Sequence, residues 1–558
     1  MNSLRKIQNR KIVAASAVGV ATAICLFGEL GAIGLVGPDE PRYAWIARAM
    51  AASGDWVTPR LYGQPWFEKP ILYYWAAAIG FRLHLPTEWA ARLPSALAAL
   101  AATATVAWLA QKHYGSDAYC PWSPMLLAPA FFSTSVAAIG FARAATPDML
   151  FAAAITLAMA CAATILRHAA ALRAAVDPGP AEKNGIAAAL LFGAFLGLAV
   201  LAKGPAAILL AAGALGIWVL ATANWRATVS LLHPLGILAF CVVALPWYAI
   251  CAKRNPDFIH IFIFQHNFER YLTPVFQHRQ PFWFFLPITL LAAIPWLAFL
   301  IRAIRQALRL WRERRWRNSP AFFFGCWAFF PILFFSFSQS KLPGYVLPAI
   351  PALALLLAVG AAPLIERNSH SHSDVLVFVL LGLTWVGLGI GACIWLARLP
   401  RAAAAQARLP IVTCAVVAIV GGIAIFALAR ARQRAAIWLS LILVCLCVEI
   451  AGVAIQPKLD PFYSARTAGT MLRADLRPDR LFEYDLPRAW HYGLAFYVHR
   501  ELPEWSETDS EPALLVTTQR QCEELRARRI SDAGCESQGG IVLVPVLPRS
   551  SSTKSAIP

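Results

Sequence analysis

Long apolar runs follow one another along most of this 558-residue chain. About thirteen of them approach the roughly 20 residues that a helix needs to cross a bilayer. Hydrophobic residues make up 59% of the sequence and charged residues only 14%, and a soluble protein of this length has no core large enough for so much apolar surface. The sequence therefore predicts an all-α polytopic membrane protein. The predicted spans cover residues 12–36, 91–111, 121–140, 146–166, 186–202, 205–222, 229–250, 282–301, 320–338, 345–364, 375–397, 411–429 and 435–455.

The basic residues set the expected orientation of these spans. The formal net charge is +19, but the largest group of arginines, between residues 302 and 317, lies between two apolar runs. Basic residues in that position anchor a loop on the cytoplasmic side, which favours membrane topology over nucleic-acid binding. Residues 1–11 are also basic and precede an apolar run that is too long for a signal peptide, so we expect an uncleaved first helix that starts inside. The loops 37–90, 251–281 and 338–344 then face outward.

The composition changes after residue 456. Residues 1–456 contain all the apolar runs, and residues 457–548 have ordinary polarity, with strand patterns at 481–484, 514–518 and 541–545 and helical patterns between them. We expect a membrane domain followed by a small α/β domain on the outer, periplasmic side. The Ser- and Pro-containing tail at 549–558 is expected to be disordered.

The cysteines divide in the same way as the composition. Ten of the twelve fall within or beside apolar runs, where a cysteine acts as a small hydrophobe. Only Cys522 and Cys535 lie in the polar part. They can pair if that part is in an oxidising compartment, but their spacing alone does not establish a disulfide.

The first outward loop, residues 37–90, is charged and interrupted by prolines. Ionisable groups at the edge of a membrane are costly to hold and mark a functional site by default. Asp39 and Glu40 are candidates for a catalytic base; the alternative is that they cap and begin the helix that follows. Lys69 suits a lipid phosphate and Glu68 a divalent metal, whereas both side chains can also simply extend into water.

Other ionisable residues fall at outward positions later in the chain. Asp148 follows Thr146 and Pro147, which is also ordinary chemistry for a helix start. Lys203 interrupts an apolar stretch, and a buried lysine needs an anion such as a lipid phosphate. His266 is either a metal ligand or a polar loop residue. Several cations beside two or three carboxylates suit an anionic lipid phosphate, whereas a transporter places its ionisable groups near the middle of the bilayer.

Ten short motifs in order between residues 35 and 350 resemble the GT-C superfamily of polyprenyl-phosphate glycosyltransferases, in the branch that includes lipid A aminoarabinose transferases and protein mannosyltransferases. Each motif is weak alone, and the ordered set is specific. The motifs are Pro38-Asp-Glu-Pro-Arg-Tyr-Ala44, Ser53-Gly-Asp-Trp56, Phe67-Glu-Lys-Pro70, Tyr73-Tyr-Trp75, Ala91-Arg-Leu-Pro-Ser95, Arg143-Ala-Ala-Thr-Pro-Asp148, Leu201-Ala-Lys-Gly-Pro205, Pro246-Trp247, His278-Arg-Gln-Pro-Phe-Trp283 and Ser340-Lys-Leu-Pro-Gly-Tyr345.

The resemblance implies a GT-C fold and roles for particular residues. It implies that Asp39 is the catalytic carboxylate, with Glu40 beside it and Asp148 lining the same cavity. It implies that Glu68 and His266 hold a divalent metal such as Zn, Mg or Mn, although the sequence around His266 departs from the family pattern. The donor phosphate would be bound by Arg42, Lys69, Lys203, Arg270, Lys341 and Tyr345.

The leading hypothesis is therefore a transferase in the bacterial inner membrane that moves a sugar, such as 4-amino-4-deoxy-L-arabinose, from a polyprenyl phosphate to lipid A or another envelope acceptor. A mannosyltransferase acting on protein or polysaccharide is the alternative within the same chemistry. A lipid or solute transporter and a catalytically silent scaffold are alternatives from other classes, and both predict that Asp39 can be replaced by Asn without loss of function.

Overall fold

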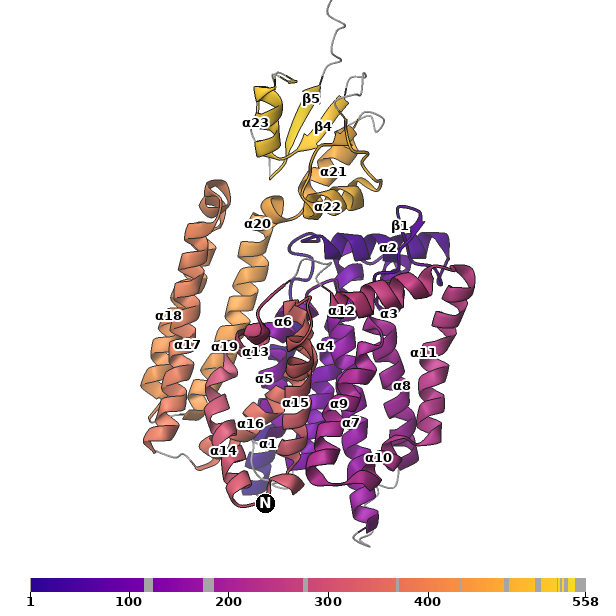
Figure 1. The fold of residues 1–558 in the computed structure, drawn as a ribbon. Coiled ribbons are helices and arrows are strands. Elements are labelled where there is room, and N and C mark those ends of the chain that lie inside the picture. The colour runs from indigo at the N-terminus through magenta and orange to yellow at the C-terminus, as the bar shows by residue number, and fades with distance from the viewer. Residues whose placement is uncertain are drawn as a thin grey trace, which may run out of the picture.

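The computed structural model describes residues 2–114, 124–173, 185–273, 279–367, 371–430, 433–475, 481–506, 513–528, 530–531, 534–535 and 540–546. These residues form a bundle of long helices, an outer layer of short elements across one end of the bundle, and a small sheet-containing unit beyond that layer (Figure 1). The predicted tail at 549–558 and His278 lie outside the described residues.

The bundle is that of a multi-pass membrane protein. Eight helices in the described part are long and apolar enough to cross a membrane, or ten if two bent helix pairs each count as one span. Three further apolar helices are shorter, so the total of thirteen spans stays a prediction, although each predicted run overlaps a helix or a bent pair. The helices of the bundle are α1 (Asn2–Phe27), α4 (Thr87–Tyr114), α5 (Pro124–Ser133), α6 (Val136–Ala142), α7 (Asp148–Arg173), α8 (Gly185–Lys203), α9 (Ala206–Thr222), α10 (Trp225–Leu231), α11 (Pro234–Arg254), α13 (Phe285–Ala292), α14 (Leu300–Arg312), α15 (Pro320–Ser336), α16 (Ile350–Arg367), α17 (His372–Arg398), α18 (Arg401–Leu428) and α19 (Gln433–Ile450).

The two bent helix pairs contact each other where each of them breaks. α5 and α6 meet at 55°, and the segment from Phe282 to Ala292 meets the segment from Trp296 to Arg312 at 106°, so the predicted span 282–301 is not one straight helix. The Val136 N–H donates to the Ile294 carbonyl over 3.0 Å, and the Trp296 indole N–H donates to the Thr134 hydroxyl over 2.9 Å. A helix break inside a membrane protein must satisfy its backbone groups within the protein, and these bonds do so.

Short elements form the outer layer across the helix ends. Loop 37–90 contains two helices, α2 and α3, and Gly54 ends α2 in the left-handed conformation (φ 73°) that glycine adopts without strain. The layer also includes a two-stranded hairpin and a stretch of π-helix. Its elements are α2 (Asp39–Ser53), β1 (Arg60–Leu61), β2 (Gln64–Pro65), α3 (Leu72–Arg82), η1 (His260–Glu269), α12 (Arg270–Leu272), η2 (Phe282–Phe284) and η5 (Pro343–Ala349); elsewhere, η3 (Trp296–Phe299) precedes α14 and η4 (Trp316–Asn318) follows it.

The chain after α19 forms the small unit seen above α2 in Figure 1. Its sheet has the order β3-β4-β5, with β3 and β4 parallel and β4 and β5 antiparallel. Each of the three strands coincides with a strand predicted from the sequence. The elements are η6 (Ala451–Ile455), α20 (Gln456–Tyr463), α21 (Arg466–Asp475), β3 (Leu481–Glu483), α22 (Arg488–Val498), β4 (Ala513–Thr517), α23 (Gln519–Ala527) and β5 (Val542–Val546).

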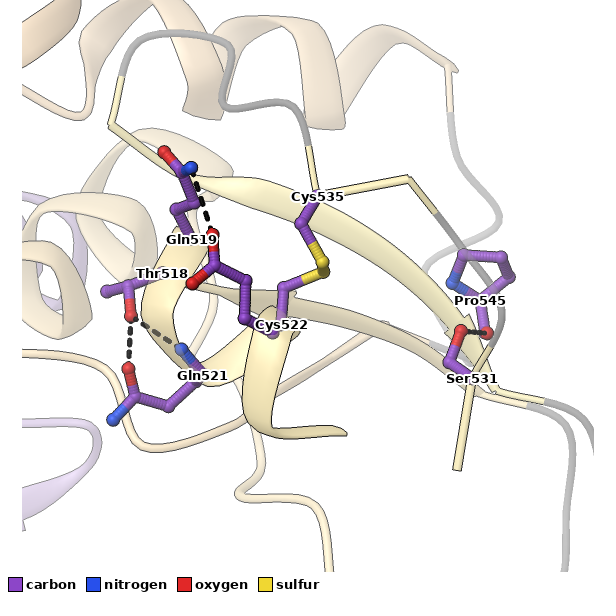
Figure 2. The surroundings of a disulfide bond; sticks show 8 residues. Thr518, Gln519, Gln521, Cys522, Ser531, Cys535 and Pro545 are labelled. Carbon is purple, nitrogen blue, oxygen red and sulfur yellow. Dashed lines mark hydrogen bonds between the residues drawn. A yellow bond between two sulfur atoms is a disulfide. The ribbon is translucent and has the colours of Figure 1, made fainter. Parts of the chain in front are cut away.

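A disulfide joins Cys522 of α23 to Cys535, which lies between α23 and β5 (Figure 2). Cys522 and Leu525 are buried with Leu515 and Val544 in a core of the unit's own. The Ser531 hydroxyl donates to the Pro545 carbonyl over 2.9 Å, so the same loop is also fastened to β5. The pairing of the two polar cysteines, which their spacing left open, is thus present in the structure.

Candidate functional site

A network of charges surrounds Glu68 in the outer layer. The Glu68 carboxylate lies 2.9 Å from a guanidinium nitrogen of Arg42, 3.1 Å from the ammonium of Lys69 and 3.7 Å from a guanidinium nitrogen of Arg270. Arg42 also donates to Asp39 over 2.5 Å. Five residues with predicted roles, Asp39 among them, therefore lie in one continuous network.

Helix α2 places Asp39 at the edge of this network. Asp39 and Glu40 form its first turn, where the positive end of the helix dipole favours carboxylates. Neighbouring helical residues point about 100° apart, so the two carboxylates face different surroundings. The Asp39 side chain is 50% exposed, whereas that of Arg42 is only 3% exposed. Asp39 is therefore held by a buried cation and is open to a ligand.

Glu40 faces the protein interior. Its carboxylate accepts hydrogen bonds from the backbone N–H groups of Val36 and Ala145, both over 2.7 Å, and from the Arg92 guanidinium over 2.7 and 3.2 Å. A carboxylate with four such bonds has no lone pair directed at a reacting group. This arrangement favours a positioning role for Glu40 over the catalytic role expected from the sequence.

A cavity of about 500 Å³ opens beside Glu68 and Lys69. Its polar end also includes Lys203, His266, Arg270 and Tyr345. Most of the remaining wall is formed by apolar side chains: Phe151, Ile208, Leu209, Phe262, Phe268, Leu272, Phe334 and Phe335. A cationic end joined to an apolar wall matches an amphiphile with an anionic headgroup.

Asp148 and Lys203 form an ion pair at this polar end. The Lys203 ammonium also lies 4.8 Å from the centre of the Tyr345 ring, a cation–π distance. Asp148 begins α7 and Lys203 ends α8, so the pair joins the ends of two membrane helices. Asp148 itself does not line the cavity in the described part of the chain; it contacts the cavity through Lys203.

Lys341 and Arg42 were expected to bind the donor phosphate, but their contacts lie elsewhere. Lys341 is buried and its ammonium donates to the Ser338 carbonyl. Arg42 is occupied by Asp39 and Glu68, and its guanidinium lies 5.2–5.5 Å from the ring centres of Tyr43, Trp66 and Tyr492. Neither residue is part of the cavity lining described above. Of the six predicted phosphate ligands, the structure brings Lys69, Lys203, Arg270 and Tyr345 together.

The surroundings set the charge states of Glu68 and His266. Burial alone would raise the pKa of Glu68, but Lys69, Arg42 and Arg270 outweigh it and lower the pKa to about 2. Burial lowers the pKa of His266 to about 4; Glu68 opposes this shift, and Lys69, Arg270 and Arg42 add to it. At neutral pH the site therefore holds an ionised Glu68 and a neutral His266.

Glu68 and His266, the predicted metal ligands, line the same cavity. A neutral imidazole and a carboxylate are suitable donors for a divalent ion. The described residues contain no group of three or more His, Cys, Asp or Glu side chains that could hold a metal. The pair therefore fits an ion only if other oxygens, such as those of a bound phosphate, complete its coordination.

Two residues of the site had no predicted role. Arg92 donates to Glu40 and also to the carbonyls of Leu30, Ile33 and Gly34. Its position as an arginine at the start of an apolar run is the sequence signal that could have indicated this role. Tyr492 reaches Arg42 from α22, more than 400 residues along the chain. No local sequence pattern indicates such a contact.

Comparison with known proteins gives the class to which this fold and site correspond. A family model described as dolichyl-phosphate-mannose-protein mannosyltransferase matches residues 19–262. The crystal structure of ArnT from Cupriavidus metallidurans bound to undecaprenyl phosphate matches with a TM-score of 0.73 and 25% identity, over 95% of this chain and 97% of that chain. The fold is that of the GT-C glycosyltransferases, and the predicted resemblance to this superfamily is confirmed.

Within that class the chain resembles the aminoarabinose transferases. The undecaprenyl phosphate-alpha-4-amino-4-deoxy-L-arabinose arabinosyl transferase of Edwardsiella ictaluri is 32% identical over 347 residues, 62% of this chain. That match spans 59% of the relative's length. The protein of the same name from Pseudomonas aeruginosa is 28% identical over 548 residues, which cover 92% of this chain and 95% of the relative.

Proposed function

We propose that this protein is a membrane glycosyltransferase that moves 4-amino-4-deoxy-L-arabinose from undecaprenyl phosphate to lipid A. The observation that carries the proposal is the cavity whose polar end combines Lys69, Lys203, Arg270 and Tyr345 beside Asp39 and Glu68. A lipid phosphate fits the cationic end and a prenyl chain fits the apolar wall. The similarity to ArnT with bound undecaprenyl phosphate supports this choice of donor.

The proposed reaction is a single displacement at the anomeric carbon. The acceptor oxygen forms the new bond, and the bond from the anomeric carbon to the phosphate oxygen breaks, with its electron pair passing to the lipid phosphate. Lys69, Lys203 and Arg270 stabilise that leaving group. Asp39 takes the proton when the acceptor is a hydroxyl, and it orients the acceptor when the acceptor is an ionised phosphate.

We include a divalent metal in the proposal at Glu68 and His266. When bound there with the donor phosphate, the ion would neutralise charge on the leaving group. The positive charges of Arg42, Lys69 and Arg270 already balance the negative charge of Glu68. These side chains would therefore also help to neutralise the leaving group. Elemental analysis of the purified protein, with and without undecaprenyl phosphate and for Glu68→Gln and His266→Gln, tests the assignment.

We further propose that the protein lies in the bacterial inner membrane with its site and C-terminal unit in the periplasm. The Cys522–Cys535 disulfide supports this orientation, because disulfides persist in oxidising compartments. The domain limits at residues 456 and 548 belong to the same proposal. Labelling of single exposed cysteines from each side of the membrane tests the orientation.

Binding of undecaprenyl phosphate to the purified protein is the direct test of the donor site. Lys69→Ala is expected to weaken binding about tenfold or more, because it removes one charge-assisted contact to the phosphate. Lys253→Ala, an exposed lysine at the end of α11, is the matched control and should bind as the unchanged protein does. Equal affinity in Lys69→Ala would contradict the phosphate role of Lys69.

Mass spectrometry of lipid A from matched strains tests the product. A lipid A species that gains the mass of an aminopentose only when the protein is present is the expected result. The match to a protein mannosyltransferase family makes protein a second candidate class of acceptor. Unchanged lipid A together with accumulation of a prenyl-phosphate sugar in the strain lacking the protein would favour that second class.

A further inference from the structure

Helix α14 carries an apolar stripe and a basic stripe side by side. None of its 13 residues, all of which the structure describes, is buried. The apolar side chains of Ile304, Leu308 and Trp311 are 49%, 48% and 64% exposed and recur at helical spacing. The basic stripe consists of the arginines at positions 302, 305, 309 and 312. A helix with these two stripes suits the boundary between the acyl chains and the headgroups of a membrane.

An apolar groove of about 510 Å³ lies between the first turns of α14 and the middle of α17. Every lining residue except Thr384 is apolar, and Ile301 and Leu383 are examples from the two helices. The Thr384 hydroxyl donates to the Leu380 carbonyl over 2.9 Å, so the one polar side chain of the described lining already has a partner. The groove therefore suits a hydrocarbon chain.

The groove and the basic stripe meet along one side of α14. Arg305 follows the groove residue Ile301 by four positions and Arg312 follows it by eleven, and these spacings place all three side chains on one face of the helix. α14 runs away from the groove toward the end of the bundle opposite the C-terminal unit (Figure 1). At 1.5 Å per residue, Arg305 and Arg312 lie about 6 and 16 Å beyond Ile301 in that direction.

Two of the four arginines in the stripe have no acidic partner among the described residues. Arg302 pairs with Asp374 of α17 over 2.7 Å, and Arg309 pairs with Glu313 over 2.7 Å. Arg305 and Arg312 are exposed and form no ion pair with any residue in the described part of the chain. They are about 10 Å apart along the helix axis, so both long side chains can reach one phosphate between them and donate charge-assisted hydrogen bonds to it.

We propose that α14 and α17 form a binding site for an anionic phospholipid in the leaflet opposite the donor site. One acyl chain lies in the groove, and the phosphate binds Arg305 and Arg312. Phosphatidylglycerol supplies the net negative charge that this site needs, whereas the ammonium of phosphatidylethanolamine is repelled by the same arginines. The inference goes beyond the proposed function, because the groove and the donor cavity share no lining residue in the described chain.

Native mass spectrometry of the purified full-length protein tests the site with phosphatidylglycerol and phosphatidylethanolamine that carry identical acyl chains. We expect phosphatidylglycerol to bind at least tenfold more tightly. Arg305→Gln together with Arg312→Gln should weaken phosphatidylglycerol binding about tenfold or more and leave phosphatidylethanolamine binding unchanged. Arg305→Lys together with Arg312→Lys keeps both charges and should restore most of the lost affinity.

Arg401→Gln together with Arg408→Gln is the matched control for charge. These two arginines are also exposed and seven positions apart, but they lie on α18. Leu383→Trp fills the groove and should weaken binding of both phospholipids, whereas Ile423→Trp, at an exposed position of α18, should not. Undecaprenyl phosphate binding should be the same in all these variants, which shows that they are folded.

Three results would overturn the proposal. The first is equal affinity of the unchanged protein for the two phospholipids. The second is unchanged phosphatidylglycerol binding when Arg305 and Arg312 are both replaced by Gln. The third is an equal loss in the control with Arg401 and Arg408 replaced, because overall positive charge would then explain the attraction. Absence of undecaprenyl phosphate binding to the unchanged protein would instead count against the proposed function alone.

Discussion

At the scale of single residues, the two neighbouring acids of α2 illustrate how a helix separates similar side chains. Asp39 is half exposed and paired with Arg42, whereas Glu40 is buried and accepts four hydrogen bonds. Both acids were predicted to belong to the site, because their adjacent positions in the sequence do not reveal which side chain faces the interior. Lys341 is a similar case: its charge was visible in the sequence, but its bond to the Ser338 carbonyl was not.

Replacement of Asp39 by Asn is expected to lower kcat by about 10²- to 10⁴-fold, the usual contribution of a general base. Donor binding should persist, because the Asn amide oxygen can still accept from Arg42. Turnover by the purified variant and undecaprenyl phosphate binding check the two parts. Asp257→Asn, an exposed acid before η1, is the control; near-normal turnover in Asp39→Asn would instead agree with a scaffold or transporter.

The partly buried His266 is expected to make stability depend on pH. Its folded pKa of about 4 lies below the ordinary value near 6.5. Between these values the unfolded chain binds a proton that the folded chain does not, so stability falls as the pH drops from about 6.5 toward 4. Thermal unfolding at pH 7, 6 and 5 should show a smaller loss for His266→Gln than for the exposed control His260→Gln.

At the scale of elements, α22 links the C-terminal unit to the site. The Tyr492 ring lies 5.3 Å from the Arg42 guanidinium, and the Tyr497 hydroxyl accepts from the Leu35 N–H and donates to Glu88. Arg48 of α2 donates to the Phe496 carbonyl. The sequence predicted the strands and helices of this unit from local patterns. Its contact with α2 depends on residues hundreds of positions apart, so local patterns carried no signal for it.

Tyr492→Leu is expected to lower kcat about fivefold, which corresponds to roughly 1 kcal/mol for a desolvated cation–π contact. The KM for the donor should stay the same, because Tyr492 acts through Arg42 and Asp39. Tyr492→Phe keeps the ring and should restore kcat. Tyr463→Leu, an exposed tyrosine of α20, is the control. An equal loss in the Phe and Leu variants would contradict the ring contact with Arg42.

At the scale of the whole molecule, the membrane region and the C-terminal unit have different sources of stability. The unit's own small core includes the disulfide, which closes a loop with a sequence separation of 13 residues. A loop of about that length is typically stabilised by about 3 kcal/mol. The membrane bundle instead depends on helix packing and on bonds such as those between its two bent pairs.

The double variant Cys522→Ala with Cys535→Ser is therefore expected to lower the stability of the C-terminal unit by about 3 kcal/mol and to leave the membrane bundle unchanged. Hydrogen exchange followed by mass spectrometry distinguishes the two regions. Faster exchange confined to β4, α23 and β5 is the expected result. Cys393→Ala, an exposed cysteine of α17, serves as the control, and equal exchange in β4, α23 and β5 of both proteins would contradict the prediction.

The contacts of residues 31–35 have a consequence for how the protein is made. Asp460 accepts from the Gly34 N–H, a sequence separation of 426, and Arg466 donates to the Gly31 and Ala32 carbonyls. Contacts of such long sequence separation form late, because domains are synthesised and folded from the N-terminus. During synthesis, the segment before Asp39 can form these contacts only after most of the chain has left the ribosome. In a ribosome stalled before residue 460 the segment before Asp39 would lack these contacts, so we expect activity to appear only near the end of translation.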